Sequence, residues 1–448
     1  MRRRTLLSII VVIVSLSMLV AGCGQKEPAA DESPQTGEEA SAAPDAERQV
    51  LAQGITDDEI LVGSTFGNSG VYAVIGVPLL AAFEAVVNRV NENGGIGGRN
   101  VRLIHYDDGF DAANGKALTE KLMEEDKVFA LGCAGAHIVT TSHDYIQDYG
   151  IPLVYIATGL DFIYSENAPD SNIFPVQPRF GQDGEFIIAR LFNEALFGPN
   201  KDEKLPEDVK VGVMYVNSDA GNDLLGGIMV QAEREGKTDQ IVAEGVTAAT
   251  YSTAIQKFKD QGIGAVVALT TDMKGIIAAM DDAQYEVPVF AYYGASSLTA
   301  WSPETYKETR PCYTTCWADY STETAKQRLE DFYDALQYGD IDDELKDAYR
   351  ENNYARAGYV GAKILVEGLQ RLEDSGMDYS WENFTTCMEQ DPFVLITGDT
   401  VDFADGQRLG FTKEAVFEYY AVTGEDGNPV MSSEVVRPFE TIEEIMAK

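Results

Sequence analysis

Residues 128–161 constrain the fold of this chain most strongly, because they contain a complete strand–helix–strand unit. The strands are predicted over residues 128–132 and 152–157, and the helix between them over residues 138–149. Both strands are short apolar runs bounded by Gly or Pro, which is typical of central strands in a parallel sheet covered on both faces. This stretch therefore favours an open α/β sheet with helices on both sides.

Small residues follow each of these two strands. Residues 133–136 read Cys-Ala-Gly-Ala, and Thr158 and Gly159 follow the second strand. Small side chains let a ligand approach the backbone and the free N–H groups of the next helical turn, and open α/β sheets bind ligands at the carboxyl ends of their strands. We therefore expect these residues to form half of a small-molecule cleft.

The alternation of strands and helices continues along the chain. Further strands are predicted over residues 60–63, 101–106, 209–215, 241–246, 265–269, 287–292, 313–319 and 416–422. Helices are predicted over residues 78–93, 112–125, 180–197, 222–235, 253–261, 274–284, 323–336, 354–372 and 381–390. We expect Pro78 to begin its helix and the sequence Asn93-Gly94-Gly95 to end it.

This order predicts an α/β fold with two doubly wound lobes joined by a multi-segment hinge. We assign residues 54–160 and 294–400 to a first lobe, and residues 161–293 and 401–440 to a second lobe. A chain that builds one lobe, then another, and then returns must cross between them several times. Those crossings are expected to act as the hinge.

The N-terminus resembles a bacterial lipoprotein signal. Residues 2–4 are arginines, residues 6–20 are apolar, and the sequence Leu-Val-Ala-Gly-Cys ends at Cys23. The resemblance implies a signal peptide over residues 1–22, lipidation of Cys23 and an anchor on the extracytoplasmic face of the cell membrane; an uncleaved signal anchor is the alternative. Residues 23–53 are predicted to be a disordered tether, because they contain no aromatic residue and little periodic apolar sequence.

Composition and motifs exclude several functions. The formal net charge is −39, which argues against nucleic-acid binding because phosphate contacts need clustered Lys and Arg. The sequence contains no HExxH, GxSxG, phosphate-loop or CxxC motif. We therefore expect no metal, no cofactor and no enzymatic activity. Cys312 and Cys316 are spaced so that a local disulfide is possible, and the sequence leaves this open.

Several further motifs carry a family resemblance. They lie at residues 55–60, 91–99, 105–111, 125–130, 151–159 and 177–178. In order and spacing the chain resembles the solute-binding lipoproteins of ABC importers, in the branched-chain amino acid class of type I periplasmic binding proteins. The resemblance implies a monomer with three crossing segments, a small solute clamped between the lobes, and a membrane permease as partner. A ligand-sensing module that signals to a membrane partner is the alternative.

The resemblance also implies ligand-binding residues in the first lobe. Thr158, after Ala157, matches the threonine that holds the polar head of the ligand. The family's serine in the loop before the next helix is replaced by Ala136 or His137, whose loop is expected to offer backbone N–H groups to a carboxylate. The predicted first-lobe site comprises Ser69, Tyr72, Ala136, His137, Ala157, Thr158 and Gly159.

In the second lobe the resemblance points to Asp219, Ala220, Thr271 and Tyr293. Ala220 stands where an aromatic residue is often found, and Tyr293 stands in place of the acidic residue that receives the ammonium in leucine-type receptors. Asp219 or Asp272 could provide an ammonium partner instead. These differences leave the solute open among an amino acid, a related aromatic or aliphatic carboxylate, and an amide.

Overall fold

The computed structural model describes residues 52–167, 171–198, 200–424 and 427–448. These residues fall within one compact unit, Gln49–Lys448. The predicted signal peptide, Cys23 and nearly all of the predicted tether lie outside the described residues.

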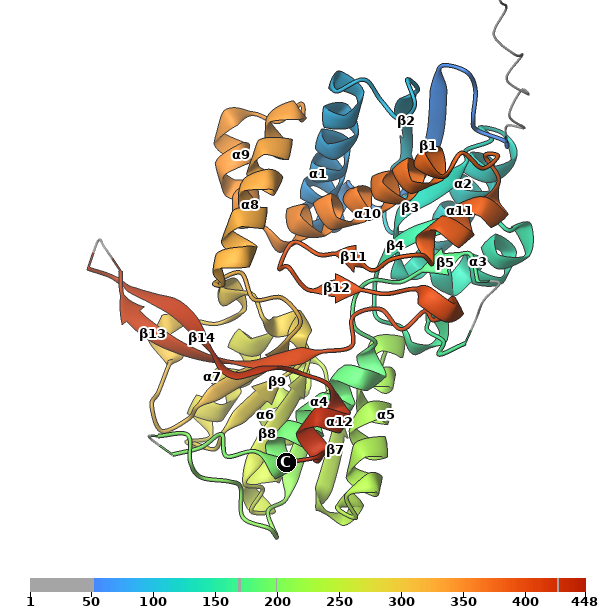
Figure 1. The fold of residues 1–448 in the computed structure, drawn as a ribbon. Helices are drawn as coiled ribbons and strands as arrows, with labels where there is room; N and C mark the ends of the chain where they lie inside the picture. Colours follow the sequence, from blue (N-terminus) through green and yellow to red (C-terminus); the bar gives the residue numbers. More distant parts are fainter. Residues whose placement is uncertain (1–51, 168–170, 199, 425–426) are drawn as a thin grey trace, which may run out of the picture. The chain divides into compact units, whose positions relative to one another are not determined.

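The first lobe is built on a parallel sheet with the strand order β2-β1-β3-β4-β5 (Figure 1). The strands are β1 (Glu59–Thr65), β2 (Asn100–Tyr106), β3 (Ala130–Gly135), β4 (Leu153–Ala157) and β5 (Ile173–Phe174). The register pairs Val62 of β1 with Ala130 of β3, and Gly135 of β3 with Ala157 of β4. The carboxyl ends of β3 and β4 are therefore level with each other.

Helices cover both faces of this sheet, as doubly wound α/β sheets require. One face packs against α1 (Ala73–Glu92) and α10 (Asn353–Ser375), and the other against α2 (Ala112–Glu124) and α3 (Ala136–Tyr149). The remaining helices of this lobe are α8 (Glu323–Ala335), α9 (Asp343–Arg350) and α11 (Trp381–Met388). A short two-stranded sheet, β11 (Phe393–Val394) with β12 (Thr400–Val401), follows α11.

Helix α1 differs from the prediction at its start. It begins at Ala73, so Pro78 lies inside the helix rather than at its first position. The N–H that Pro78 lacks would have paired with the carbonyl of Val74, a residue that is 70% exposed, so water can satisfy that carbonyl. The helix ends where predicted, because Gly94 and Gly95 adopt positive φ angles of 100° and 72°. In the described chain α1 alone is long and apolar enough to cross a membrane, but it is a core helix packed against α10.

The second lobe contains a seven-stranded sheet with the order β14-β13-β10-β9-β8-β6-β7 (Figure 1). Strands β6 to β10 are parallel, and β13 and β14 are antiparallel to their neighbours. The strands are β6 (Val211–Tyr215), β7 (Ile241–Gly245), β8 (Ala265–Leu269), β9 (Val289–Ala291), β10 (Cys312–Cys316), β13 (Glu414–Thr423) and β14 (Pro429–Glu440).

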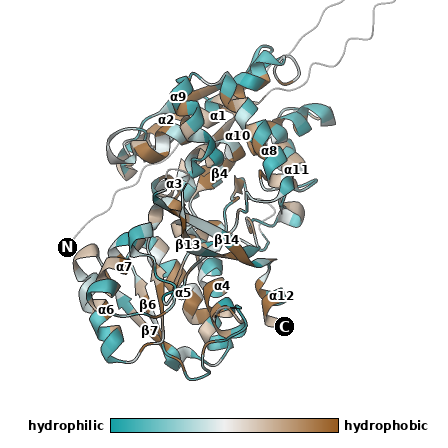
Figure 2. Ribbon diagram, turned by 90° about the vertical axis from the view of Figure 1, so that its left-hand side faces the viewer, coloured by the Kyte–Doolittle hydropathy of each residue, from teal (hydrophilic) through white to brown (hydrophobic). Residues whose placement is uncertain are grey.

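Helices also cover both faces of the second sheet. Helices α4 (Phe180–Asn193) and α5 (Asp219–Arg234) pack on one face, and α6 (Tyr251–Asp260) and α7 (Met273–Asp282) pack on the other. The short helix α12 (Ile442–Met446) packs against α4. Figure 2 shows that strands such as β4 are hydrophobic and lie between helices whose colours mix hydrophobic and hydrophilic residues. The predicted α/β fold with two doubly wound lobes is confirmed.

The boundaries between the lobes differ from those predicted. Strand β5 pairs with β4, so Ile173 and Phe174 belong to the first sheet, beyond the expected boundary at residue 160. Strand β10 pairs with β9 and β13, so residues 312–316 belong to the second sheet rather than to the first lobe. The Tyr and Thr residues of β10 favour a strand, but local sequence contains no information about which strands it pairs with.

Three crossing segments, residues 175–179, 317–321 and 407–413, connect the two sheets. The first and third run side by side, because the N–H of Phe411 donates to the carbonyl of Val176 at 2.9 Å. The second lies beside the third, with the rings of Trp317 and Phe411 6.3 Å apart. Arg408 fastens the third segment to the first lobe by donating from Nη2 to the carbonyl of Ser171 at 2.7 Å.

The cysteines of the described chain are free and buried. Cys312 and Cys316 both lie in β10, where four residues span about 13 Å. A disulfide requires Cα atoms within about 7 Å, so the strand geometry rules out the bridge that the spacing alone allowed. Burial also raises the pKa of the Cys133 thiol, which keeps this residue a small core side chain.

Candidate functional site

The first-lobe site is located at the carboxyl ends of β1, β3 and β4. Tyr72 ends the short 3₁₀ helix Gly70–Tyr72 that follows β1, and His137 is the second residue of α3, directly after β3. Thr158 follows β4, and the pairing of Gly135 with Ala157 sets Ala136 beside Thr158 at this edge. The structure therefore brings the predicted first-lobe residues to one edge of one sheet.

An aromatic column connects two of the predicted residues. The rings of Tyr72 and Phe110 are stacked with centroids 4.0 Å apart. The centroid of the His137 ring also lies 4.0 Å from that of Phe110. Phe66 meets Phe110 edge-on at 6.0 Å. Such ring pairs hold one another in a fixed geometry. Phe110 therefore orients both Tyr72 and His137.

Asp108 fixes the other side of His137. Its Oδ2 lies 2.9 Å from His137 Nε2 and accepts a hydrogen bond from Thr65 Oγ1 at 2.7 Å, while Oδ1 accepts from the N–H of Phe110 at 2.7 Å. Burial on its own raises the pKa of this carboxyl, but the hydrogen bonds from His137 and Thr65 outweigh it, and the pKa is lowered. An ionised Asp108 thus locks the orientation of the imidazole.

Ser69 lies on the exposed side of the same edge. It precedes the 3₁₀ helix, and its hydroxyl bonds to the carboxylate of Asp107. The same carboxylate accepts from the N–H groups of Asn68 and Gly109, each at 3.0 Å. Asp107 therefore holds the loop after β1 against the loop after β2.

Gly159 and Tyr293 connect the two lobes. A methyl group added to Gly159 would lie 2.8 Å from the Tyr293 hydroxyl and 2.5 Å from the carbonyl oxygen of Pro178, so the site has no room for a side chain. The Tyr293 hydroxyl donates to Pro178 at 3.3 Å, and its ring stacks on Phe180 at 5.9 Å. Tyr293 is thus a buried residue of the junction rather than an exposed group at the end of β9. The carbonyl of Thr158 accepts from the Tyr164 hydroxyl at 3.2 Å.

The second-lobe residues Asp219 and Ala220 begin α5. The helix starts three residues earlier than predicted, because the Ser218 side chain accepts a hydrogen bond from the N–H of Gly221 at 3.2 Å. Ala220 packs against the apolar cluster of the first lobe that includes Leu160. Asp219 is exposed. This helix start therefore lies against residues that follow β4.

Thr271 is exposed in the loop between β8 and α7. The register pairs Tyr215 of β6 with Leu269 of β8, so Thr271 and Asp219 lie at the same edge of the second sheet. Asp272 caps α7 by accepting from the N–H of Gly275 at 3.0 Å. Its carboxylate is engaged in that cap, which leaves Asp219 as the better candidate for an ammonium partner.

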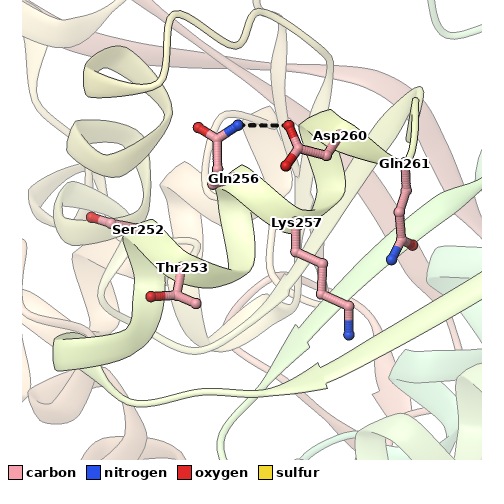
Figure 3. Close-up of a pocket in the computed structure, with 6 residues that line it drawn as sticks. All are labelled: Ser252, Thr253, Gln256, Lys257, Asp260 and Gln261. Atoms are coloured by element: carbon pink, nitrogen blue, oxygen red, sulfur yellow. Dashed lines mark hydrogen bonds between the residues drawn. The ribbon is translucent and has the colours of Figure 1, made fainter.

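Among the described residues no group of three or more His, Cys, Asp or Glu side chains is placed to bind a metal ion. A hollow lies on the outer face of α6, and Figure 3 shows that its side chains come from that one helix and its end, without converging. Its lining residues are Ser252, Thr253, Gln256, Lys257, Asp260 and Gln261. This hollow lies on a different element from the strand ends described above.

The sequence analysis missed the residues that position His137. Asp108 and Phe110 occur within the quoted motif at residues 105–111, and they directly follow β2. Two acidic residues and an aromatic residue at the end of a parallel strand are the signal that could have identified them. Thr65, at the last position of β1, offered no such signal.

The family comparison decides the class of protein. The profile of the periplasmic binding protein family matches residues 59–427. The chain belongs to this family. The match includes both sheets except β14.

Solved structures of periplasmic binding proteins share the fold. A fatty acid ABC transporter substrate-binding protein from Thermomonospora curvata has a TM-score of 0.66 at 15% identity, over 89% of this chain and 97% of that one. A branched-chain amino acid ABC transporter protein from Thermus thermophilus, with bound valine, has a TM-score of 0.64 at 14% identity, over 89% and 100%.

A third structure, an ABC transporter substrate-binding protein from Desulfitobacterium hafniense in complex with Leu, has a TM-score of 0.58 at 17% identity, over 84% and 100%. At these identities the likeness demonstrates the fold. Among curated protein sequences, no match was found. The predicted resemblance to type I periplasmic binding proteins is confirmed.

Proposed function

We propose that this protein is the extracytoplasmic solute-binding component of an ABC importer, and that it binds a small solute between its two lobes. The observation that carries the proposal is the placement of the strand ends. Residues after β1, β3 and β4 gather at one edge of the first sheet, and the end of β4 meets the end of β9 through Gly159 and Tyr293. Ligands of open α/β sheets bind at such carboxyl ends.

The solute is proposed to be an amino acid or a related carboxylate or amide. Helix α3 begins at Ala136 without a side-chain cap, so its first N–H groups are available to a carboxylate. Thr158 offers a hydroxyl beside them, and Asp219 offers a carboxylate for an ammonium group. Related structures support this range, since one holds valine, one holds Leu and one is described as a fatty acid binder.

Binding is proposed to occur by closure of the lobes about the three crossing segments, without chemical conversion of the solute. Closure excludes water, which strengthens the few hydrogen bonds made at the strand ends. Micromolar affinity requires only about 8 kcal/mol. Docking to the permease then releases the solute if it favours the open state.

The protein is proposed to be a monomer held at the membrane by a lipid on Cys23. The lipobox-like sequence that ends at Cys23 supports this anchor. In cells expressing the Cys23→Ala variant, the protein should lose metabolic lipid labelling and partition away from membranes. A variant that is still labelled would contradict the assignment.

The first experiment is a thermal-shift screen of the full-length protein in detergent against amino acids, aromatic acids, dicarboxylates and amides. A ligand at one hundred times its Kd should stabilise the protein by about 2.7 kcal/mol. Stimulation of a reconstituted permease by the loaded protein would establish import. Binding without such stimulation would favour a sensory role and contradict the importer proposal.

Thr158→Ala tests the site once a ligand is found. Loss of the hydroxyl should weaken binding at least about tenfold, equivalent to about 1.4 kcal/mol, because a hydrogen bond to a charged group is lost. The control is Thr386→Ala, an exposed threonine on α11 whose loss should leave affinity unchanged. Equal affinities of Thr158→Ala and the original protein would remove Thr158 from the site.

A further inference from the structure

Two carboxyl groups from distant parts of the chain are buried against each other in the second lobe. Asp183 lies in the first turn of α4 and is 0% exposed, and Glu414 is the first residue of β13 and is 1% exposed. Their side chains are in hydrogen-bonding contact. A carboxylate only accepts hydrogen bonds, so this contact requires that one of the two groups carries a proton.

The remaining partners identify which oxygens are satisfied. Asp183 Oδ1 accepts from the hydroxyl of Thr315, and Oδ2 accepts from the N–H of Tyr293 at 3.2 Å. Neither carboxyl oxygen of Glu414 has a hydrogen-bond donor among the side chains and backbone of the described residues. Among the described residues, the carboxyl of Asp183 is the side chain placed to hydrogen-bond Glu414.

Arg190 is the cation closest to the pair, and it is engaged elsewhere. Its Nη1 pairs with Glu194 at 2.8 Å and with Glu440 at 2.9 Å. Its Nη2 donates to the backbone carbonyls of Glu414 and Pro438 at 2.7 and 2.8 Å. The guanidinium thus contacts the backbone of Glu414 rather than its carboxyl oxygens. Two other carboxylates already share its charge.

The other titratable groups that face the pair come from the turn after β9 and from β10. They are Tyr292, Tyr293 and Cys316. Burial raises the pKa of each of them, so they are uncharged at neutral pH. A second negative charge on the carboxyl pair would therefore meet little compensation.

The position of the pair relates it to the hinge. Asp183 follows the first crossing segment, residues 175–179, and Thr315 precedes the second, residues 317–321. Glu414 directly follows the third, residues 407–413. The two carboxyls and their hydroxyl donor thus join the second-lobe ends of all three crossing segments.

We propose that Asp183 and Glu414 share one proton, and that this proton holds the three crossing segments together at the second lobe and makes the hinge sensitive to pH. Loss of the proton places two adjacent anions in the core and loosens the junction. The shared proton acts in the protein without solute, so its effect on the hinge does not depend on the identity of the ligand.

The direction of the pH effect follows from burial. Burial raises the pKa of both carboxyls above the value of about 4 that they have in the unfolded chain. The folded protein therefore binds more protons than the unfolded chain between those values. The stability contributed by the shared proton is fully present below about pH 4 and is lost as the pH rises through the raised native pKa.

The test compares urea unfolding of the full-length protein from about pH 5 to pH 8 with that of Asp183→Asn and Glu414→Gln. Either amide supplies the missing donor permanently. Raising the pH should therefore increase the unfolding equilibrium constant of the original protein, relative to that of each variant, by about tenfold per unit of pKa shift. Asp282→Asn, an exposed acid on α7, is the control and should follow the original protein. If the stability of Asp183→Asn and Glu414→Gln changes with pH in the same way as that of the original protein, the proposal is overturned.

A second measurement does not depend on the folding of the variants. Infrared spectroscopy of the original protein should detect the carbonyl stretch of a protonated carboxylic acid near neutral pH, shifted by isotopic labelling of Asp or Glu. Hydrogen exchange should accelerate at the amide of Tyr293 when that band disappears at higher pH. Absence of the band near neutral pH would overturn the proposal even if neither variant folds.

Discussion

Asp108 in the first lobe and Asp183 in the second are both fully buried, yet the pKa of Asp108 is lowered and that of Asp183 is raised. Burial raises both values. At Asp108 the hydrogen bonds from His137, Thr65 and the N–H of Phe110 together outweigh burial. At Asp183 burial outweighs the hydrogen bonds with Glu414, Thr315 and the N–H of Tyr293. Burial alone therefore does not decide whether an aspartate in this fold is ionised.

The two aspartates consequently perform different tasks. An ionised Asp108 orients the imidazole of His137 at the candidate binding edge. The Asp183–Glu414 pair joins the crossing segments on which closure depends. One region uses a fixed charge to hold a side chain, and the other uses a proton to hold the backbone.

The largest contrast is expected from making the same substitution at both positions. Asp108→Asn should reduce the free energy of unfolding at pH 7 by about 3 kcal/mol, because it removes the ionised acceptor of a buried hydrogen-bond network and leaves donors unsatisfied. Asp183→Asn should change it by less than about 1 kcal/mol, because its amide can donate to Glu414. Urea unfolding of both variants measures the difference, and the reverse order would contradict the assigned ionisation states.

A smaller contrast is expected in the pH dependence. The stability that ionised Asp108 contributes is present above its unfolded pKa of about 4 and is lost as the pH falls through its lowered native pKa. The gap between the original protein and Asp108→Asn should therefore narrow by about 1.4 kcal/mol per unit of pKa shift on acidification. The stability that the Asp183–Glu414 pair contributes changes in the opposite direction, because it is lost as the pH rises. A gap that widens below about pH 4 would show that Asp108 is not stabilised as the carboxylate.

The smallest contrast concerns the hydroxyl donors. Thr65→Val removes a hydrogen bond to a charged acceptor and should cost about 2 kcal/mol, whereas Thr315→Val removes one from the proton-sharing pair and should cost about 1 kcal/mol. Both side chains are buried, so the same exchange of hydroxyl for methyl is compared at both sites. Thermal unfolding at neutral pH measures both losses. Equal costs would indicate equal charge on the two aspartates.

Local sequence was sufficient to predict most elements of the fold. The apolar run at residues 265–269 was predicted as a strand, and β8 has those bounds. Strand β14 was missed, because it is an edge strand whose Ser, Glu and Arg residues lack a continuous apolar pattern. The helix α9 was missed for a similar reason, since Tyr349 is its single buried residue.

The candidate site was predictable only in part. Small residues after β3 and β4 marked the binding edge, and the structure brings Ala136 and Thr158 together there. Tyr293 was predicted at the same site, and the structure engages its hydroxyl with Pro178 at the lobe junction. The direction of that side chain depends on how the lobes pack, and the residues around position 293 in the sequence do not specify it.

The sequence by itself determined the alternation of buried strands and amphipathic helices, because periodicity and turn residues act within a few positions. Only the tertiary structure decided that β10 joins the second sheet, that Asp108 pairs with His137, and that Asp183 meets Glu414. These contacts join residues that are 23 to 231 positions apart. They depend on where the chain crosses between the lobes, and the charge of a buried carboxyl depends on the partners that those crossings supply.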